Sequence, residues 1–183
     1  GSQVTFVLDT IAGLPHTVRA YRNQTLAAFA ETTWGNGSIL VGGGIASVLA
    51  ILGVSVGGMI GILGVTSLSS LNLSPMAGLI TGYAATREMA PIVAAVGFAA
   101  QAGCRMTAEI GSMRISEEID ALEAQAIRPI PFVVGTRVIA GVLAIVPFYL
   151  ISLCLAYLSS RIVVSVVYGN SAGAYDRYVE AFV

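Results

Sequence analysis

The sequence predicts an all-α integral membrane protein, and both its composition and the spacing of its charges indicate this class. Only 10% of the 183 residues are charged, against about 25% in an average soluble domain. Hydrophobic residues make up 56% of the chain, and the mean hydropathy is +0.84. So few charges cannot cover the surface of a soluble domain. The charges are also unevenly placed, since 55 consecutive uncharged residues separate Glu31 from Arg87.

The composition also excludes several classes of function. A net charge of −1 provides no basic field for nucleic acid. All nine basic residues are arginines, so the chain lacks the lysine with which a P-loop holds ATP. The single histidine, His16, and the two cysteines, Cys104 and Cys154, show no spacing typical of a metal site. We therefore expect no catalytic residue, metal site or cofactor in this chain.

The first predicted element is a helix that lies in the membrane interface over residues 14–36. Leu14, Val18, Tyr21 and Phe29 fall near one face of such a helix, and the arginines of this stretch lie elsewhere. An apolar face beside charged residues, before a long apolar segment, is typical of an interfacial helix.

Two membrane-spanning helices are expected next. A span needs about 20 residues, so the long uncharged stretch is too long for one helix. Polar residues at 66–75 divide it. We expect the first span over 39–65 and the second over 76–113. At about 1.5 Å per residue the second span exceeds the hydrocarbon thickness, so one of its ends projects into water.

A short amphipathic helix is predicted over 115–127. Its apolar residues recur at helical spacing, and Ser116 can cap its N-terminus. Glu117 and Glu118 favour the positive end of the helix dipole, and prolines at 129 and 131 end the helix. The apolar residues of this stripe are Ile115, Ile119, Leu122 and Ala126.

A third span over 132–164 and an extracytoplasmic loop over 165–183 complete the predicted elements. The third span contains 23 consecutive uncharged residues, and Pro147 is expected to kink it. Three spans are an unusual number on which to end, and the chain begins with Gly1 and Ser2 rather than methionine. We therefore expect a fragment of a longer protein, with a single membrane domain that is truncated at its C-terminus.

The arginines predict the orientation of the chain in its membrane, which we expect to be the inner (plasma) membrane. Arg19 and Arg22 precede the first span, and Arg114 and Arg128 lie between the second and the third, whereas the loop after the first span has none. Because basic residues are enriched on the cytoplasmic side, the N-terminus and the acidic helix are expected there.

Two pairs of charges lie inside predicted spans. A charge within a membrane helix costs several kcal/mol unless it is paired or hydrated, which makes it a candidate functional residue. Arg87 and Glu88 form either a polar site in a cavity or a pair that extends to the interface. Arg105 and Glu109 are i, i+4 neighbours and form either a stabilising pair or a part of a substrate path.

Two further patterns each allow two interpretations. The acidic residues of the short helix form either a solvated face or a docking surface for a motor protein. The run Gly53, Gly57 and Gly61 lets helices approach closely, either within this chain or between two copies. The acidic residues are Glu117, Glu118, Asp120 and Glu123.

One motif suggests an enzyme, but its context argues against it. Gly169 to Gly173 matches G-x-S-x-G and follows a run of β-branched residues that is typical of a strand. A hydrolase of this kind needs a histidine after the serine in chain order. The only histidine, His16, lies far before Ser171. A glycine-rich turn at the end of the third span is the better interpretation.

Three motifs together resemble the MlaE/YrbE permeases, the membrane subunits of ABC lipid transporters that work with MCE proteins. These motifs are R-E-x-x-P at 87–91, A-E-I-G at 108–111 and S-E-E-I-D-A-L at 116–122. The subtype that the chain most resembles is the YrbE-B subunit of actinobacteria, including mycobacteria. One departure is Ala100-Gln101-Ala102, where many members read A-G-R, with Arg105 following later.

The resemblance implies a fold of five transmembrane helices after an interfacial helix, of which this chain covers three. It implies that Arg87, Glu88 and Pro91 lie at a lipid cavity. It also implies that the acidic helix couples the permease to a cytoplasmic ATPase. The residues implied in that coupling are Ser116, Glu117, Glu118, Asp120, Leu122 and Glu123.

The expected activity is therefore transport rather than catalysis. The lipid would be a fatty acid, mycolate, sterol or phospholipid, and the partner ATPase would bind ATP and Mg²⁺. A sibling permease and MCE proteins on the outer side are the other expected partners. The alternative is a membrane scaffold that anchors MCE proteins without moving lipid. A secondary transporter would have no use for the acidic helix.

Overall fold

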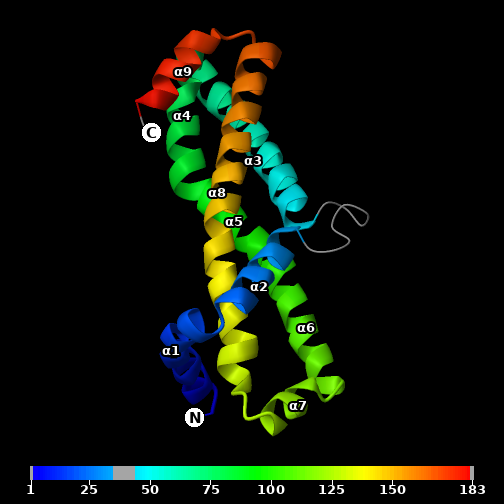
Figure 1. Cartoon of the computed structure of the whole chain (residues 1–183). Coiled ribbons are helices and arrows are strands. Elements are labelled where there is room, and N and C mark those ends of the chain that lie inside the picture. Colours follow the sequence, from blue (N-terminus) through cyan, green and yellow to red (C-terminus); the bar gives the residue numbers. More distant parts are fainter. Residues whose placement is uncertain (1, 35–43, 182–183) are drawn as a thin grey trace. The chain divides into compact units, whose positions relative to one another are not determined.

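The computed structural model describes residues 2–34 and 44–181 as helices joined by short turns. Parts of three predicted elements, residues 35–36, 39–43 and 182–183, lie outside the described residues. Three helical stretches are long and apolar enough to cross a membrane, namely Ile45–Ser69, Ser74–Ile115 and Ile130–Val167. The described residues contain no strand, and the predicted all-α membrane class is confirmed. Figure 1 labels the α-helices along the chain.

The helices in chain order include four π-helical turns, designated η2 to η5, and one 3-10 turn, η1. The bounds are α1 Ser2–Ala20, α2 Arg22–Trp34, α3 Gly44–Ser69, η1 Ser74–Met76, α4 Ala77–Tyr83, η2 Ala84–Met89, α5 Ala90–Phe98, η3 Ala99–Gly103, α6 Cys104–Ile115, α7 Glu118–Ala124, η4 Ile130–Gly135, α8 Thr136–Ile162, η5 Val163–Val167 and α9 Ala172–Glu180.

These elements form two compact units. The first unit contains residues 1–45 and 99–146, and the second contains residues 46–98 and 147–183. Helix α8 continues through Pro147, the residue at which the chain passes from the first unit to the second.

In the second unit, α3 packs closely on α8 through small residues on both helices. A Cβ atom on Gly57 would lie 2.2 Å from the carbonyl oxygen of Ala156. Gly53 and Gly61 meet Ser152 and Ser160 in the same way, one turn to either side. Small residues at four-residue spacing on both helices allow the two backbones to approach. The run of glycines therefore packs within this chain.

Helix α9 packs against α4 in the second unit. A Cβ on Gly78 would lie 2.5 Å from the carbonyl oxygen of Tyr175, so glycine is required at this contact. Burial raises the pKa of the Tyr175 hydroxyl above its ordinary value. Arg161 donates hydrogen bonds of 2.8 and 2.9 Å to Asp176 and holds the pKa of that carboxyl below its usual range. The predicted loop over 165–183 thus contains a docked helix.

In the first unit, α1 packs on the π turn that precedes α8. The hydroxyl of Thr17 donates to the backbone oxygens of Gly13 and Pro131, at 3.1 Å each. A Cβ on Gly135 would lie 2.7 Å from Thr17 Oγ1. Tyr21 and Phe132 add an edge-to-face ring contact with centroids 5.1 Å apart.

The N-terminal helix differs from the predicted one. The sequence suggested one helix over 14–36, whereas the structure has α1 from Ser2 and a separate α2, with Tyr21 outside both. Helix α1 exposes a series of large apolar side chains, which is typical of a helix that lies in a membrane interface. These residues are Val4, Phe6, Val7, Leu8, Ile11 and Val18.

Replacing Gly57 with alanine tests the close contact of α3 with α8. Because the new Cβ would overlap the backbone at Ala156, we expect Gly57→Ala to destabilise the fold by about 1–3 kcal/mol. Gly58→Ala is the matched control, since its nearest neighbour is Ser159 Oγ at 3.3 Å. It should be neutral or stabilising by up to about 1 kcal/mol. Thermal unfolding midpoints in detergent measure both, and equal effects of the two substitutions would contradict the packing argument.

Candidate functional site

Arg87 and Glu88 lie on the π turn η2, between α4 and α5 in the second unit. Pro91 explains why the helix widens here. It has no N–H to donate to the carbonyl of Arg87, and its ring crowds that carbonyl. Local π geometry is one way in which a membrane helix accommodates a proline. Such turns are also frequent at functional sites.

Two tyrosines of α8 hold this π turn. The hydroxyl of Tyr157 is hydrogen-bonded to the hydroxyl of Thr86, the residue before Arg87. Tyr149 donates from its hydroxyl to the backbone oxygen of Thr86 at 3.4 Å. The turn is thus fixed from one side by polar contacts within the second unit.

Arg87, Glu88 and Pro91 are all exposed in this chain. Neither charged residue forms an ion pair with another part of the described chain. Two unpaired charges inside an apolar helical stretch require water, lipid head groups or another protein segment around them. The arrangement therefore suits a polar surface within the membrane that meets a ligand or a partner.

The acidic helix is shorter than predicted. Helix α6 continues to Ile115, and α7 occupies Glu118–Ala124 within the predicted range of 115–127. Ser116 ends α6 instead of capping α7, and its hydroxyl donates to the backbone of Ser112 and to the Glu118 carboxylate. The interaction of Arg114 with Asp120, at 3.1 Å, joins the two helices.

Two residues with left-handed backbone conformation flank α7. Glu117 and Ala126 both have φ of 59°, a conformation that costs a non-glycine residue about 1 kcal/mol or more. Ile119 and Leu122 of the predicted apolar stripe are half-buried, whereas Ile115 is 86% exposed and Ala126 is exposed. Glu117, Glu118, Asp120 and Glu123 are all exposed, so they form an acidic surface that a partner can reach.

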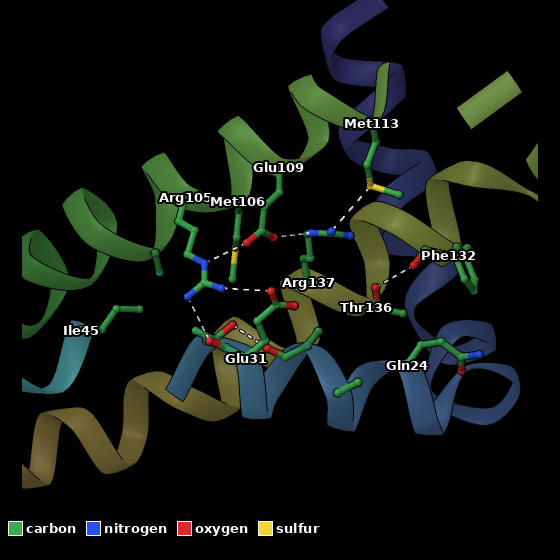
Figure 2. A pocket seen from close by; sticks show the side chains of 14 residues that line it. Gln24, Glu31, Ile45, Arg105, Met106, Glu109, Met113, Phe132, Thr136 and Arg137 are labelled. Carbon is green, nitrogen blue, oxygen red and sulfur yellow. Dashed lines mark hydrogen bonds and ion pairs between the residues drawn. The ribbon is translucent and has the colours of Figure 1, made fainter. Parts of the chain in front are cut away.

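The first unit contains a cluster of four charges that the sequence analysis found only in part. Figure 2 shows Glu31 of α2, Arg105 and Glu109 of α6, and Arg137 of α8 converging on one pocket. Arg105 contacts Glu31 at 3.0 Å and Glu109 at 2.8 Å, and Arg137 contacts the other oxygen of Glu109 at 3.4 Å. The charges alternate in sign along this row.

The sequence indicates Arg105 and Glu109 as a pair but does not indicate that Glu31 and Arg137 join them. Glu31 lies 74 residues before Arg105, and Arg137 lies 28 residues after Glu109, so no helical spacing relates them. Arg137 was the available signal. It is a single charge near the start of an apolar span, and such a charge requires a partner. The predicted pairing of Arg105 with Glu109 is present, as part of a larger network.

The serine motif does not have the structure of a hydrolase site. The residues before it form the π turn Val163–Val167 instead of a strand. Gly169 has φ of 68° and provides the turn, and Ser171 precedes the first residue of α9. This is the predicted glycine-rich turn. Among the described residues, no group of three metal-ligating side chains is found.

The family model described as "Permease MlaE" matches residues 36–183. The chain is 35% identical over 103 residues to the intermembrane phospholipid transport system permease protein MlaE of Haemophilus influenzae, covering 55% of this chain and 40% of that protein. It is 31% identical over 107 residues to the chloroplastic protein TRIGALACTOSYLDIACYLGLYCEROL 1 of Arabidopsis thaliana, covering 58% and 31%. A probable ABC transporter permease of Synechocystis is 43% identical over 63 residues, covering 34% and 24%. The matched regions thus span between about a quarter and two fifths of these relatives.

Replacing Glu109 tests the charge network. Glu109→Gln leaves two guanidinium groups without the carboxylate that they share, so we expect a loss of about 1–2 kcal/mol of stability. Glu180→Gln, at an exposed position of α9, is the control and should change stability by less than about 0.5 kcal/mol. Thermal midpoints in detergent at neutral pH measure both, and an unchanged midpoint for Glu109→Gln would show that the network contributes nothing.

Proposed function

The chain belongs to the MlaE permease family, and from that premise we propose that it is the permease subunit of an ABC-type lipid transporter. The observation that supports this proposal best is the exposed Arg87–Glu88 turn within an apolar helical stretch. Arg87 can pair with an anion and Glu88 with a cation. Within an apolar stretch, only a lipid head group, water or another protein segment can provide these partners.

In this proposal the chain performs no covalent chemistry. A partner ATPase hydrolyses ATP with Mg²⁺, and the permease alternates between states that differ in lipid affinity. Such coupling requires that the ATPase and the lipid both favour one state over the other. Arg87 and Glu88 contact the lipid, Pro91 sustains the turn that presents them, and the exposed acids of α7 dock the ATPase.

The remaining partners follow from the same proposal. The chain acts as a YrbE-B-type subunit beside a sibling permease, in the inner membrane, with α1, α2 and α7 on the cytoplasmic side. MCE proteins bind on the outer side and receive or deliver the lipid. The relative from Haemophilus influenzae has phospholipid transport in its name, which supports a lipid cargo for this chain.

Removing both charges of the π turn tests the transport role. We expect Arg87→Ala/Glu88→Ala to lower lipid uptake about tenfold or more, the effect of losing roughly 1.4 kcal/mol of binding. Arg177→Ala/Glu180→Ala removes the same pair of charges from exposed positions of α9 and should leave uptake unchanged. Uptake of labelled lipid is compared at equal membrane abundance. Normal uptake by the first variant would favour the non-transporting scaffold.

Reversing charges on the acidic helix tests the docking role. The complete protein is co-expressed with its sibling and the candidate ATPase, and the amount of ATPase that co-purifies is measured. We expect the acids of α7 to face basic residues of the ATPase. Glu117→Arg/Asp120→Arg would place arginines opposite those residues and should reduce the co-purified ATPase about tenfold. Glu180→Arg is the control. If the reversed variant retains the ATPase, α7 is not the docking element, and if the wild type retains none, the motor assignment fails.

A further inference from the structure

The charged pocket of the first unit can hold a ligand. It has a volume of about 220 Å³ and is lined mainly by α2, α6, the π turn η4 and the start of α8. Its charged row runs from Glu31 through Arg105 and Glu109 to Arg137 (Figure 2), and apolar side chains such as Met106 and Ala102 line the remaining wall. Two positive and two negative charges give this lining no net charge.

The two ends of the charged row keep unused bonding capacity. Arg137 donates to Glu109 and to the backbone oxygen of Val133, but its Nη2 meets only the sulfur of Met113, at 3.7 Å. A thioether is a weak acceptor, so this guanidinium would gain from a stronger one. Its side chain is only 20% exposed, which favours a charged acceptor over water.

At the other end, Glu31 uses one carboxylate oxygen to accept from Arg105. Its second oxygen has no hydrogen-bond partner among the described residues, and the side chain is 56% exposed. The row therefore ends on a cation with donors to spare and on an anion with an acceptor to spare. A ligand that carries both an anion and a cation would satisfy both ends.

We propose that this pocket binds the head group of a zwitterionic phospholipid, with its phosphate at Arg137 and a primary ammonium at Glu31. A phosphate suits a guanidinium because the two form paired hydrogen bonds. A neutral lining gives no advantage to a purely anionic lipid. A quaternary ammonium would favour several aromatic rings, whereas Phe132 is the only aromatic residue among the described residues of the lining.

The surroundings of the pocket favour a lipid over a soluble compound that carries the same phosphate and primary ammonium groups. Met106, Ala102 and Ile45 provide apolar contacts beside the charges, and α6 is the end of an apolar helical stretch. The proposal is independent of transport, because binding is measured at equilibrium without ATP or ATPase. Failure of the transport role would leave it intact.

Native mass spectrometry of the complete protein in detergent tests the proposal. The protein is incubated with equal amounts of phosphatidylethanolamine, phosphatidylcholine and phosphatidylglycerol, and bound lipids are counted. We expect phosphatidylethanolamine to exceed the other two about fivefold, as for an ion pair of about 1 kcal/mol. Glu31→Gln should bring the ratio of phosphatidylethanolamine to phosphatidylglycerol close to one, because only the ammonium contact is lost.

Three further variants separate binding from folding. Arg137→Gln should reduce retention of every phospholipid, and Met106→Trp should do the same by filling the pocket while all four charges remain. Arg177→Gln, at an exposed position of α9, is the control and should change neither the amount of bound lipid nor the ratio. If the ion network has only a structural role, Glu31→Gln will change the unfolding temperature but not the ratio of bound phosphatidylethanolamine to bound phosphatidylglycerol.

The proposal is overturned if Glu31→Gln keeps the wild-type ratio, or if Met106→Trp retains as much lipid as the control. Glycerophosphoethanolamine, which has the same head group without acyl chains, distinguishes the two sources of this chemistry. If it displaces bound phosphatidylethanolamine at equal concentration, the site recognises a soluble compound and the assignment to a lipid is wrong.

Discussion

At three of the helix contacts in this protein, a glycine lets one element approach the backbone or side chain of another. Lipid chains are as apolar as leucine, so no hydrophobic force brings two spans together, and packing depends on close approach. Gly57 against Ala156 provides it for α3 and α8, and Gly78 against Tyr175 provides it for α4 and α9. Gly135 against Thr17 serves the same purpose for α1 in the first unit. Side-chain hydrogen bonds then fix the contacts that these glycines allow.

The two candidate sites treat charge in opposite ways. At the pocket of the first unit, Glu31, Arg105, Glu109 and Arg137 pair with one another, and only the two ends of the row keep bonding capacity. In the second, the π turn presents two charges without an ion-pair partner among the described residues. Paired charges inside a membrane protein are partly satisfied without a ligand, whereas unpaired charges are costly until a ligand or partner arrives. The Arg87–Glu88 turn is therefore the stronger candidate for the cargo site.

The sequence was sufficient for the fold class and for the three apolar stretches, because composition and charge spacing respond directly to the membrane. It also located the acidic segment, whose charges exclude it from the hydrocarbon. It missed the break at Tyr21 and the docking of α9, since both depend on contacts between distant residues such as Thr17 with Pro131. Glu31 and Arg137 were missed for the same reason. The left-handed residues beside α7 were also missed, because neither glutamate nor alanine signals that conformation.

The π turn at Ala84–Met89 has a consequence for how this helix tolerates insertions and deletions. A π turn contains one residue more than the α-helical turn that it replaces, so it is equivalent to a one-residue insertion absorbed within the helix. Deleting one residue from this turn would therefore restore regular α-helical winding and leave the rotational phase of the following helix nearly unchanged. Ala94 and Gly97 would stay on the buried face. A deletion from the regular helix on either side has no such turn to absorb it and would rotate the following residues by about 100° about the axis, so this segment tolerates a shorter length best at the π turn.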